Sequence, residues 1–197
     1  MCGGKIAYLL LVSLTNIRMN IHNKASAHAF LLTALISIVE LLHPIKRMWS
    51  VLEACLFHHC LNIVVELLKI TTQIGQMMSD PLGNLHFCFT SLVTYIANTP
   101  EGSLVACICG KTSPITMASH NDFGDTFCHP PCTGATTLSQ LSHIQCNLND
   151  VLHYFTQCTP FRLNGVAVHF WHDWCHSNPA HFISPEGPRL HHWHWFS

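Results

Sequence analysis

The sequence predicts an N-terminal half that is mainly α, built from two to three apolar helices, and a C-terminal half that is irregular or poorly ordered. Three observations lead to this prediction. Four apolar stretches precede residue 98, most of the prolines follow it, and the second half shows little sustained hydrophobic periodicity. We therefore divide the chain into an apolar helical region, 1–98, and a region rich in Pro, His, Cys and Trp, 99–197.

The first apolar stretch, Ile6–Leu14, follows Lys5 and has the length of the apolar part of a secretory signal peptide. A polar stretch, Thr15–Arg18, comes directly after it, and the first small-x-small cleavage pattern, Ala25–Ala27, lies too far downstream. The sequence also contains no Asn-x-Ser/Thr glycosylation acceptor. The pattern therefore disfavours a cleaved signal.

The second stretch, Ala29–Leu42, is rich in helix formers, and Pro44 discourages continuation beyond it. It predicts a helix near 28–43. Such a helix would be about 21 Å long, which is shorter than the roughly 30 Å hydrocarbon core of a bilayer. Its large apolar side chains favour insertion whereas Glu40 opposes it, so membrane insertion is marginally favourable.

The third stretch predicts a helix near 50–70 that packs on its neighbour, with Pro44 in the turn between them. Apolar residues recur there at helical spacing and form a broad stripe, which contains Leu52, Cys55, Leu56, Cys60, Ile63, Val64, Leu67 and Leu68. Most of the polar residues fall outside this stripe. This amphipathic pattern is the clearest secondary-structure signal in the chain.

Two further segments give weaker secondary-structure signals. Leu85–Ala97 contains residues that favour a strand, lies between Pro81 and Pro100, and is free of charge, so strand, buried helix and short membrane segment all stay open. Leu138–Thr156 is a modest helical candidate in the second half. Prolines interrupt any longer helix there.

Charged residues make up only 10% of the chain, against roughly 25% in ordinary soluble domains. Nine Lys and Arg against ten Asp and Glu give a formal charge of −1, which provides no long-range field to gather polyanions. We therefore predict no nucleic-acid partner, infer no small-molecule substrate, and consider membrane lipid as the partner. The composition leaves the location in the cell unknown. If the protein is expressed, we expect it at a membrane.

The most specific metal pattern combines thiols and an imidazole at Cys128, Cys132, His143 and Cys146. These side chains are what a tetrahedral zinc site requires, and a close Cys pair forms a small chelate loop. The spacing matches none of the usual zinc modules, and 11 Cys and 17 His make such a cluster expected by chance. We therefore predict no cofactor, with zinc bound by these four residues as the alternative.

A second cluster places His169, His172 and His176 on one face if the segment is helical, with Asp173 beside them. The sequence Ser177–Pro179 ends any such helix at once, so adventitious metal binding by a His-rich tract is the simpler explanation. Four Trp residues in the same region would suit a membrane interface, but they lack neighbouring Lys or Arg. An unstructured aromatic tail therefore fits better.

The sequence lacks the common catalytic and cofactor-binding motifs. The chain has no nucleophile elbow, dinucleotide turn or zinc-protease motif, and Cys109–Thr112 shares only the tripeptide Gly-Lys-Thr with a phosphate-binding loop. Five Asp and five Glu leave little for acid/base pairs. We therefore predict that the chain is not an enzyme.

Three hypotheses follow, in order. The first is a spurious reading frame opposite another gene, because codon complementarity turns a Lys- and Glu-rich protein into a chain rich in Leu, Phe, His and Cys and poor in charge. The second is a small membrane-associated protein, which explains the scarcity of charge. The third is a zinc or other transition-metal module, which explains only Cys and His. No determinable biochemical function follows from the sequence.

Overall fold

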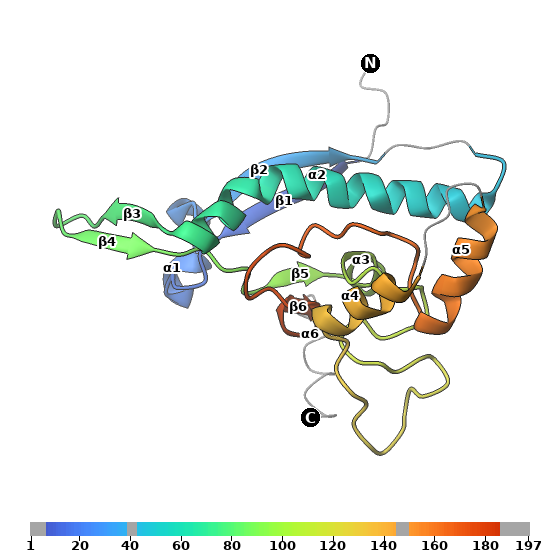
Figure 1. Cartoon of the computed structure of the whole chain (residues 1–197). Helices are drawn as coiled ribbons and strands as arrows, with labels where there is room; N and C mark the ends of the chain where they lie inside the picture. Colours follow the sequence, from blue (N-terminus) through green and yellow to red (C-terminus); the bar gives the residue numbers. More distant parts are fainter. Residues whose placement is uncertain (1–6, 39–42, 145–149, 186–197) are drawn as a thin grey trace.

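The computed structural model describes residues 7–38, 43–144 and 150–185. The chain begins with two antiparallel strands, β1 (Ala7–Ser13) and β2 (Phe30–Ser37), which form a separate two-stranded ribbon (Figure 1). The pairing shifts register between Leu10 and Leu11. The connection between the two strands holds a one-turn helix, α1 (Met19–His22), and the 3₁₀ turn η1 (Ala25–Ala27).

The helix expected near 28–43 is therefore wrong, and so is a mainly α N-terminal half, because strands come first. The run Phe30–Ser37 is apolar without a clear period, and such a run fits a strand as well as a helix. Pairing with β1 satisfies its backbone groups. Tyr8 and Ile36, which pair across the ribbon, face the core, whereas Leu9 and Leu35 pair on the outer face and are 67% and 62% exposed.

The helix expected near 50–70 is confirmed as α2 (Lys46–Ile74), which is longer than predicted and is the longest helix in the described residues (Figure 1). It begins two residues after Pro44 and ends at Gly75, which has a positive φ of 71°. A Cβ at Gly75 would lie 2.3 Å from the Phe87 ring, so this end of the helix requires glycine.

The face that α2 buries differs from the apolar stripe of the sequence. Its buried residues are Val51, Ala54, Phe57, His58, Leu61, Val65, Lys69 and Thr72. In contrast, Leu52, Ile63 and Leu67 of the stripe are 36%, 58% and 76% exposed. The helix therefore turns one histidine and one lysine inward and leaves several large apolar side chains outside.

The open alternatives for 85–97 are decided in favour of strands. β4 (Leu85–Cys88) pairs with β3 (Gln76–Ser79) in an antiparallel hairpin that projects beyond the end of α2 (Figure 1). β5 (Tyr95–Ala97) pairs in parallel with β6 (Ile183–Pro185), which comes from the other end of the described chain. This pairing joins the first half of the molecule to the second.

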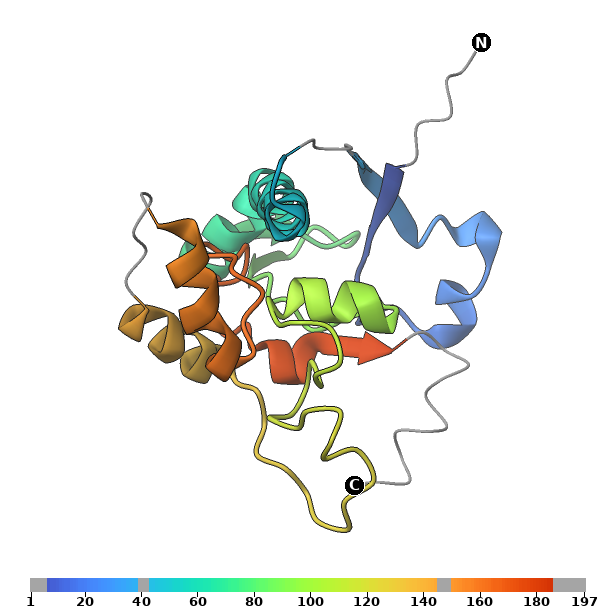
Figure 2. The ribbon, with the colours of Figure 1, turned by 90° about the vertical axis from the view of Figure 1, so that its right-hand side faces the viewer.

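The second half contains four α-helices within its described residues: α3 (Thr99–Val105), α4 (Gly134–His143), α5 (Val151–Cys158) and α6 (Pro179–Phe182), with the 3₁₀ turn η2 (Thr159–Phe161) after α5. The helical candidate 138–156 thus falls on α4 and α5, and residues 145–149 between them lie outside the described ranges. In Figure 2, α3 lies in the middle, with the β1–β2 ribbon on one side and α4 and α5 on the other.

The core joins both halves. Its principal cluster packs Phe57, Leu61 and Val65 of α2 against Val105 of α3 and against the aromatic residues Phe170, Trp171, Trp174 and Phe182. The Trp171 indole N–H also donates to the Val105 carbonyl oxygen at 2.8 Å. The prediction of an irregular or poorly ordered second half is therefore wrong for the described residues, because helices form there and the four aromatic side chains named above are buried in the core. The division into domains at residue 98 stays a prediction.

Candidate functional site

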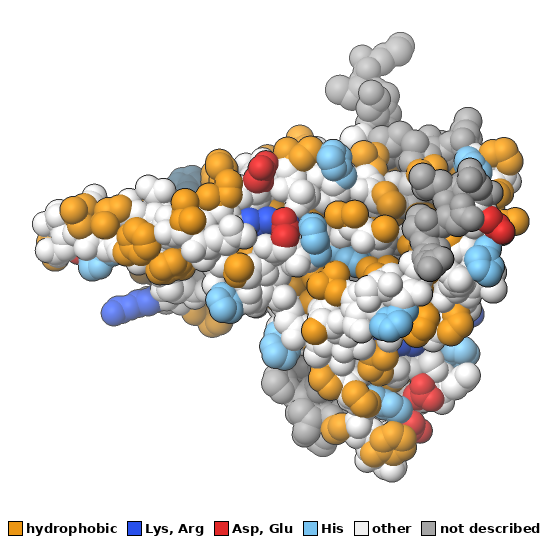
Figure 3. All heavy atoms as spheres, viewed as in Figure 1, with side chains coloured by type: hydrophobic (Ala, Val, Ile, Leu, Met, Phe, Trp, Pro, Cys, Tyr) orange, Lys and Arg blue, Asp and Glu red, His pale blue; other side chains and the backbone are white. Residues whose placement is uncertain are grey.

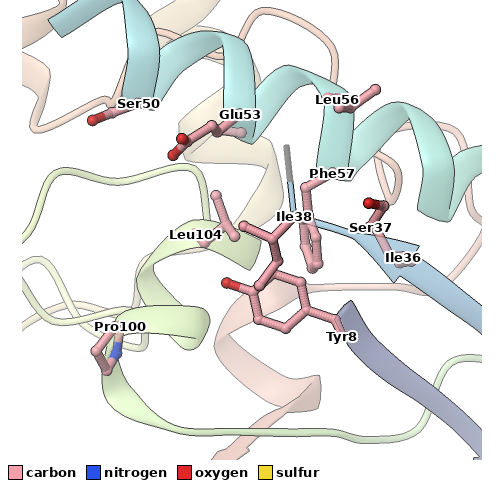
Figure 4. A pocket seen from close by; sticks show the side chains of 11 residues that line it. Tyr8, Ile36, Ser37, Ile38, Ser50, Glu53, Leu56, Phe57, Pro100 and Leu104 are labelled. Carbon is pink, nitrogen blue, oxygen red and sulfur yellow. The ribbon is translucent and has the colours of Figure 1, made fainter. Parts of the chain in front are cut away.

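A pocket of about 410 Å³ lies where the β1–β2 ribbon meets α2 and α3 (Figure 4). Phe57 points from α2 toward Tyr8 of β1, and their rings meet edge to face with centroids 5.6 Å apart. Ile36, Ile38 and Leu104 complete an apolar wall. The pocket volume lies in the range of small-ligand sites, and most of the lining residues are apolar.

Four polar side chains line the same pocket, namely Tyr8, Ser37, Ser50 and Glu53. None of them makes a side-chain hydrogen bond or ion pair with another residue in the described ranges. Glu53 and Ser50 come from the same face of α2, and the Glu53 carboxylate is exposed at the rim (Figure 4). No Lys or Arg is among the lining residues. The pocket therefore offers hydrogen-bond acceptors and one negative charge to a ligand.

A buried histidine, His58, holds α2 to two other segments. Its Nε2–H donates to the Leu104 carbonyl oxygen at 3.0 Å, and its Nδ1 accepts from the Phe170 backbone N–H at 3.3 Å. Cys107 Sγ lies 3.0 Å from the same Nε2. Burial lowers the pKa of His58 to about 4, although the bond to the Leu104 carbonyl opposes the shift. His58 is therefore neutral at neutral pH and ties the core together.

His169 lies beside it, with the two imidazole centroids 6.0 Å apart. It is fully buried, stacks on the Trp171 ring at 4.6 Å, and neither of its ring nitrogens has a hydrogen-bond partner among the described residues. Burial lowers its pKa to about 3, with further contributions from His58 and His172. Burial likewise raises the pKa of the Cys107 thiol well above its ordinary value. All three groups are thus neutral at neutral pH, so the two imidazoles are weak bases and the thiol is not a thiolate nucleophile.

The buried lysine of α2 is paired. Lys69 Nζ donates to Asp173 Oδ1 and to Asn62 Oδ1, and its side chain is 6% exposed against 50% for Asp173. A buried ammonium requires such partners. This pair fixes the 169–175 segment on α2.

The four residues of the predicted zinc pattern are not brought together as far as they are described. Cys128 is exposed, Cys132 is buried with its Sγ 3.9 Å from Thr137 Oγ1, and His143 Nδ1 lies 2.6 Å from the Ser139 carbonyl oxygen. Cys146 lies outside the described residues. In the described part of the chain no three His, Cys, Asp or Glu side chains are placed to hold a metal ion. The four-residue zinc pattern stays a prediction.

The second predicted cluster also does not form a ligand set. Residues 170–176 form turns instead of a helix, and His176 has a positive φ of 63°. His169 is buried, whereas His172 is partly exposed and lies 3.5 Å from Asp173. The aromatic end His191–Trp195 lies outside the described ranges. Sequence reasoning missed the burial of His58 and His169 because nothing in their local patterns distinguishes them from surface histidines.

Positive charge is unevenly placed. The connection between β1 and β2, residues 14–29, carries Arg18 and Lys24, both exposed, and contains no Asp or Glu. Its fold is fixed at the base, since Ser13 Oγ lies 2.9 Å from His22 Nε2 and donates to the Ala29 carbonyl oxygen at 2.6 Å. Hydrophobic side chains are spread over the face shown in Figure 3, and Lys and Arg are few there. We call residues 14–29 the basic connection.

Comparison with known proteins gave one match, which is to a family model. No curated protein and no solved structure matches the chain. A family model described as Plavaka transposase matches residues 1–197. The spurious reading frame is therefore wrong, because the whole sequence follows the pattern of a protein family.

The same match corrects three other predictions. A transposase family implies DNA as the partner, so the exclusion of nucleic acid, which rested on net charge alone, is wrong, and the proposed membrane association is wrong with it. In the described residues α2 alone is long and apolar enough to cross a membrane, and here it serves as the core helix. The prediction that the chain is not an enzyme also conflicts with this family. By a match that spans its length, the chain belongs to the Plavaka transposase family.

Proposed function

We propose that the chain acts on DNA in a reaction of the transposase type, in which DNA strands are cleaved and joined. The single observation that carries this proposal is the family match over residues 1–197. No three metal-ligating side chains gather in the described residues. We propose that these residues hold the DNA, and we name no catalytic residue among them.

The proposed DNA contact is the basic connection. Arg18 and Lys24 are exposed there and make no ion pair with any described residue. Cations of this kind bind phosphate oxygens, and the release of counterions from DNA supplies the free energy. Amide and hydroxyl side chains in the same segment, such as Asn16, Asn20 and Ser26, can add hydrogen bonds to the backbone.

Three other described cations are less available for DNA, whereas Lys46 and Lys111 are exposed as well. Lys69 is buried against Asp173. Arg162 donates to the carbonyl oxygens of Thr116 and Ala118 at 3.2 and 3.4 Å, and the Arg47 guanidinium lies over the Phe155 ring at 4.6 Å. A net charge of −1 therefore hides a local excess of positive charge at the basic connection.

The test is the affinity of the full chain for a fluorescent duplex, measured by anisotropy at about 0.15 M salt. Replacing both Arg18 and Lys24 by Ala removes two phosphate contacts, and we expect a loss of affinity of about 10- to 50-fold. Lys46→Ala is the matched control, because this exposed residue lies outside the basic connection. Equal losses in the control and the double variant would refute the proposed contact.

The enzymatic part has its own test. The full chain is incubated with supercoiled plasmid and Mg²⁺, and open-circular or linear product is expected. Intact plasmid at protein concentrations that saturate the duplex in the anisotropy experiment would restrict the proposal to DNA binding.

A further inference from the structure

We propose that the pocket between the ribbon, α2 and α3 binds a nucleobase that carries an exocyclic amine, with the Glu53 carboxylate accepting a hydrogen bond from that amine. This inference rests on the proposed action on DNA, and it names a group of the DNA that the chain would read. Enzymes and binding proteins that read a base outside the duplex hold it in a pocket against aromatic and apolar side chains.

The shape of the pocket fits a flat, apolar-faced ligand. Its volume of about 410 Å³ lies in the range of small-molecule sites. Tyr8 and Phe57 contribute aromatic rings to the lining, and Leu104 of α3 and Ile38 contribute aliphatic side chains (Figure 4). A base in the pocket can therefore contact both aromatic and aliphatic carbon.

The polar groups of the pocket select the class of ligand. Glu53 is the one charged residue of the lining, and its carboxylate has no hydrogen-bonding partner in the described part of the chain. A carboxylate accepts from the exocyclic amino groups of cytosine, adenine and guanine, whereas thymine has no such group. Ser50 and the Tyr8 hydroxyl can both donate and accept, so they suit the mixed edge of a base.

The same charge excludes a phosphate from this site. A phosphate would face the Glu53 carboxylate without a Lys or Arg to balance it, because the lining contains neither. The base would therefore enter the pocket with its sugar and phosphate outside. The basic connection lies at the far end of the ribbon, separated from Tyr8 by the length of β1, so the two contacts are independent.

The experiment uses the full chain and free deoxynucleosides, with dissociation constants from NMR titration. We expect deoxycytidine and deoxyadenosine to bind about tenfold more tightly than thymidine, because a hydrogen bond to a charged acceptor is among the stronger ones. Glu53→Ala should abolish this preference, and Glu66→Ala, an exposed glutamate on the same helix outside the pocket, should retain it. The phosphate prediction is checked with deoxycytidine monophosphate, which should bind no more tightly than deoxycytidine.

Each outcome has a defined meaning. Equal binding of all nucleosides, a preference that survives Glu53→Ala, or tenfold tighter binding of the monophosphate would overturn the proposal. Nucleoside selectivity in a chain that fails to bind duplex DNA would uphold the pocket and refute the proposed function. Duplex binding without nucleoside binding would uphold the function and refute the pocket.

Discussion

The two faces of α2 contradict the simplest interpretation of its sequence. The inward face carries His58 and Lys69 among its buried residues, while the outward face carries Ile63 and Leu67. The inward polar groups are satisfied, since His58 bonds to two backbone groups and Lys69 pairs with Asp173. Burial therefore follows the availability of partners in the second half of the chain, and hydrophobicity alone does not set it.

The largest expected effect comes from shortening an inward apolar side chain. Leu61 is 1% exposed in the principal cluster, so Leu61→Ala should lower the free energy of unfolding by about 2–5 kcal/mol. Leu67→Ala is the matched control on the outward face, where 76% exposure predicts a change within about 0.5 kcal/mol. Urea titration of both variants measures the difference. Similar losses of unfolding free energy in the two variants would show that Leu61 and Leu67 do not differ in burial as described.

The second largest effect is expected from acid, which should destabilise the folded chain through the buried histidine of the inward face and its neighbour His169. The folded pKa values of His58 and His169, about 4 and about 3, are lower than the unfolded value of about 6.5. Below pH 6.5 the unfolded chain binds protons that the folded chain does not, so stability present at neutral pH is lost as the pH falls toward 4. From pH 7 to pH 5 we expect a loss of about 2 kcal/mol for each histidine.

His169→Phe sharpens this prediction. The side chain has no hydrogen bond to lose among the described residues, and a phenyl ring can still stack on Trp171. The variant should therefore show about half the pH dependence of the two histidines, measured by urea titration at pH 7 and pH 5. An unchanged pH dependence would mean that His169 is protonated without cost in the folded chain.

A smaller effect is expected at the lysine of the inward face. Asp173→Asn leaves the buried Lys69 ammonium without its carboxylate, and because Asp173 is half exposed we expect a loss of about 1–2 kcal/mol. In a Lys69→Met background the same change should cost almost nothing. A thermodynamic double-mutant cycle measures the coupling. Additive losses would show that the pair does not stabilise the fold.

The sequence predicts some of these features and misses others for physical reasons. Helix α2 is predictable because helical spacing extends over many residues within one segment. The strand β2 is not, since its apolar run has no period and its partner β1 lies before a 16-residue connection, 14–29. The packing of the described part of the second half is missed because the buried aromatic residues around Trp171 contact α2 and α3.

The candidate site is predictable only in part. The sequence places Glu53 on a helix but not beside Tyr8, because the pocket joins residues from four separate elements, β1, β2, α2 and α3. Net charge misleads as well, since the acid-free segment around Arg18 and Lys24 is averaged with acids elsewhere. Partner prediction therefore depends on where the charges lie and not on their sum.

The salt dependence of DNA binding tests the central claim most directly. The dissociation constant of the full chain for a duplex is measured by anisotropy between about 50 and 200 mM salt, for the wild-type chain and for the Arg18→Ala, Lys24→Ala double variant. We predict binding that weakens with salt, with a logarithmic slope about 1.8 smaller in magnitude for the double variant, because two phosphate contacts are lost. No binding, or equal slopes for the two proteins, would contradict the account.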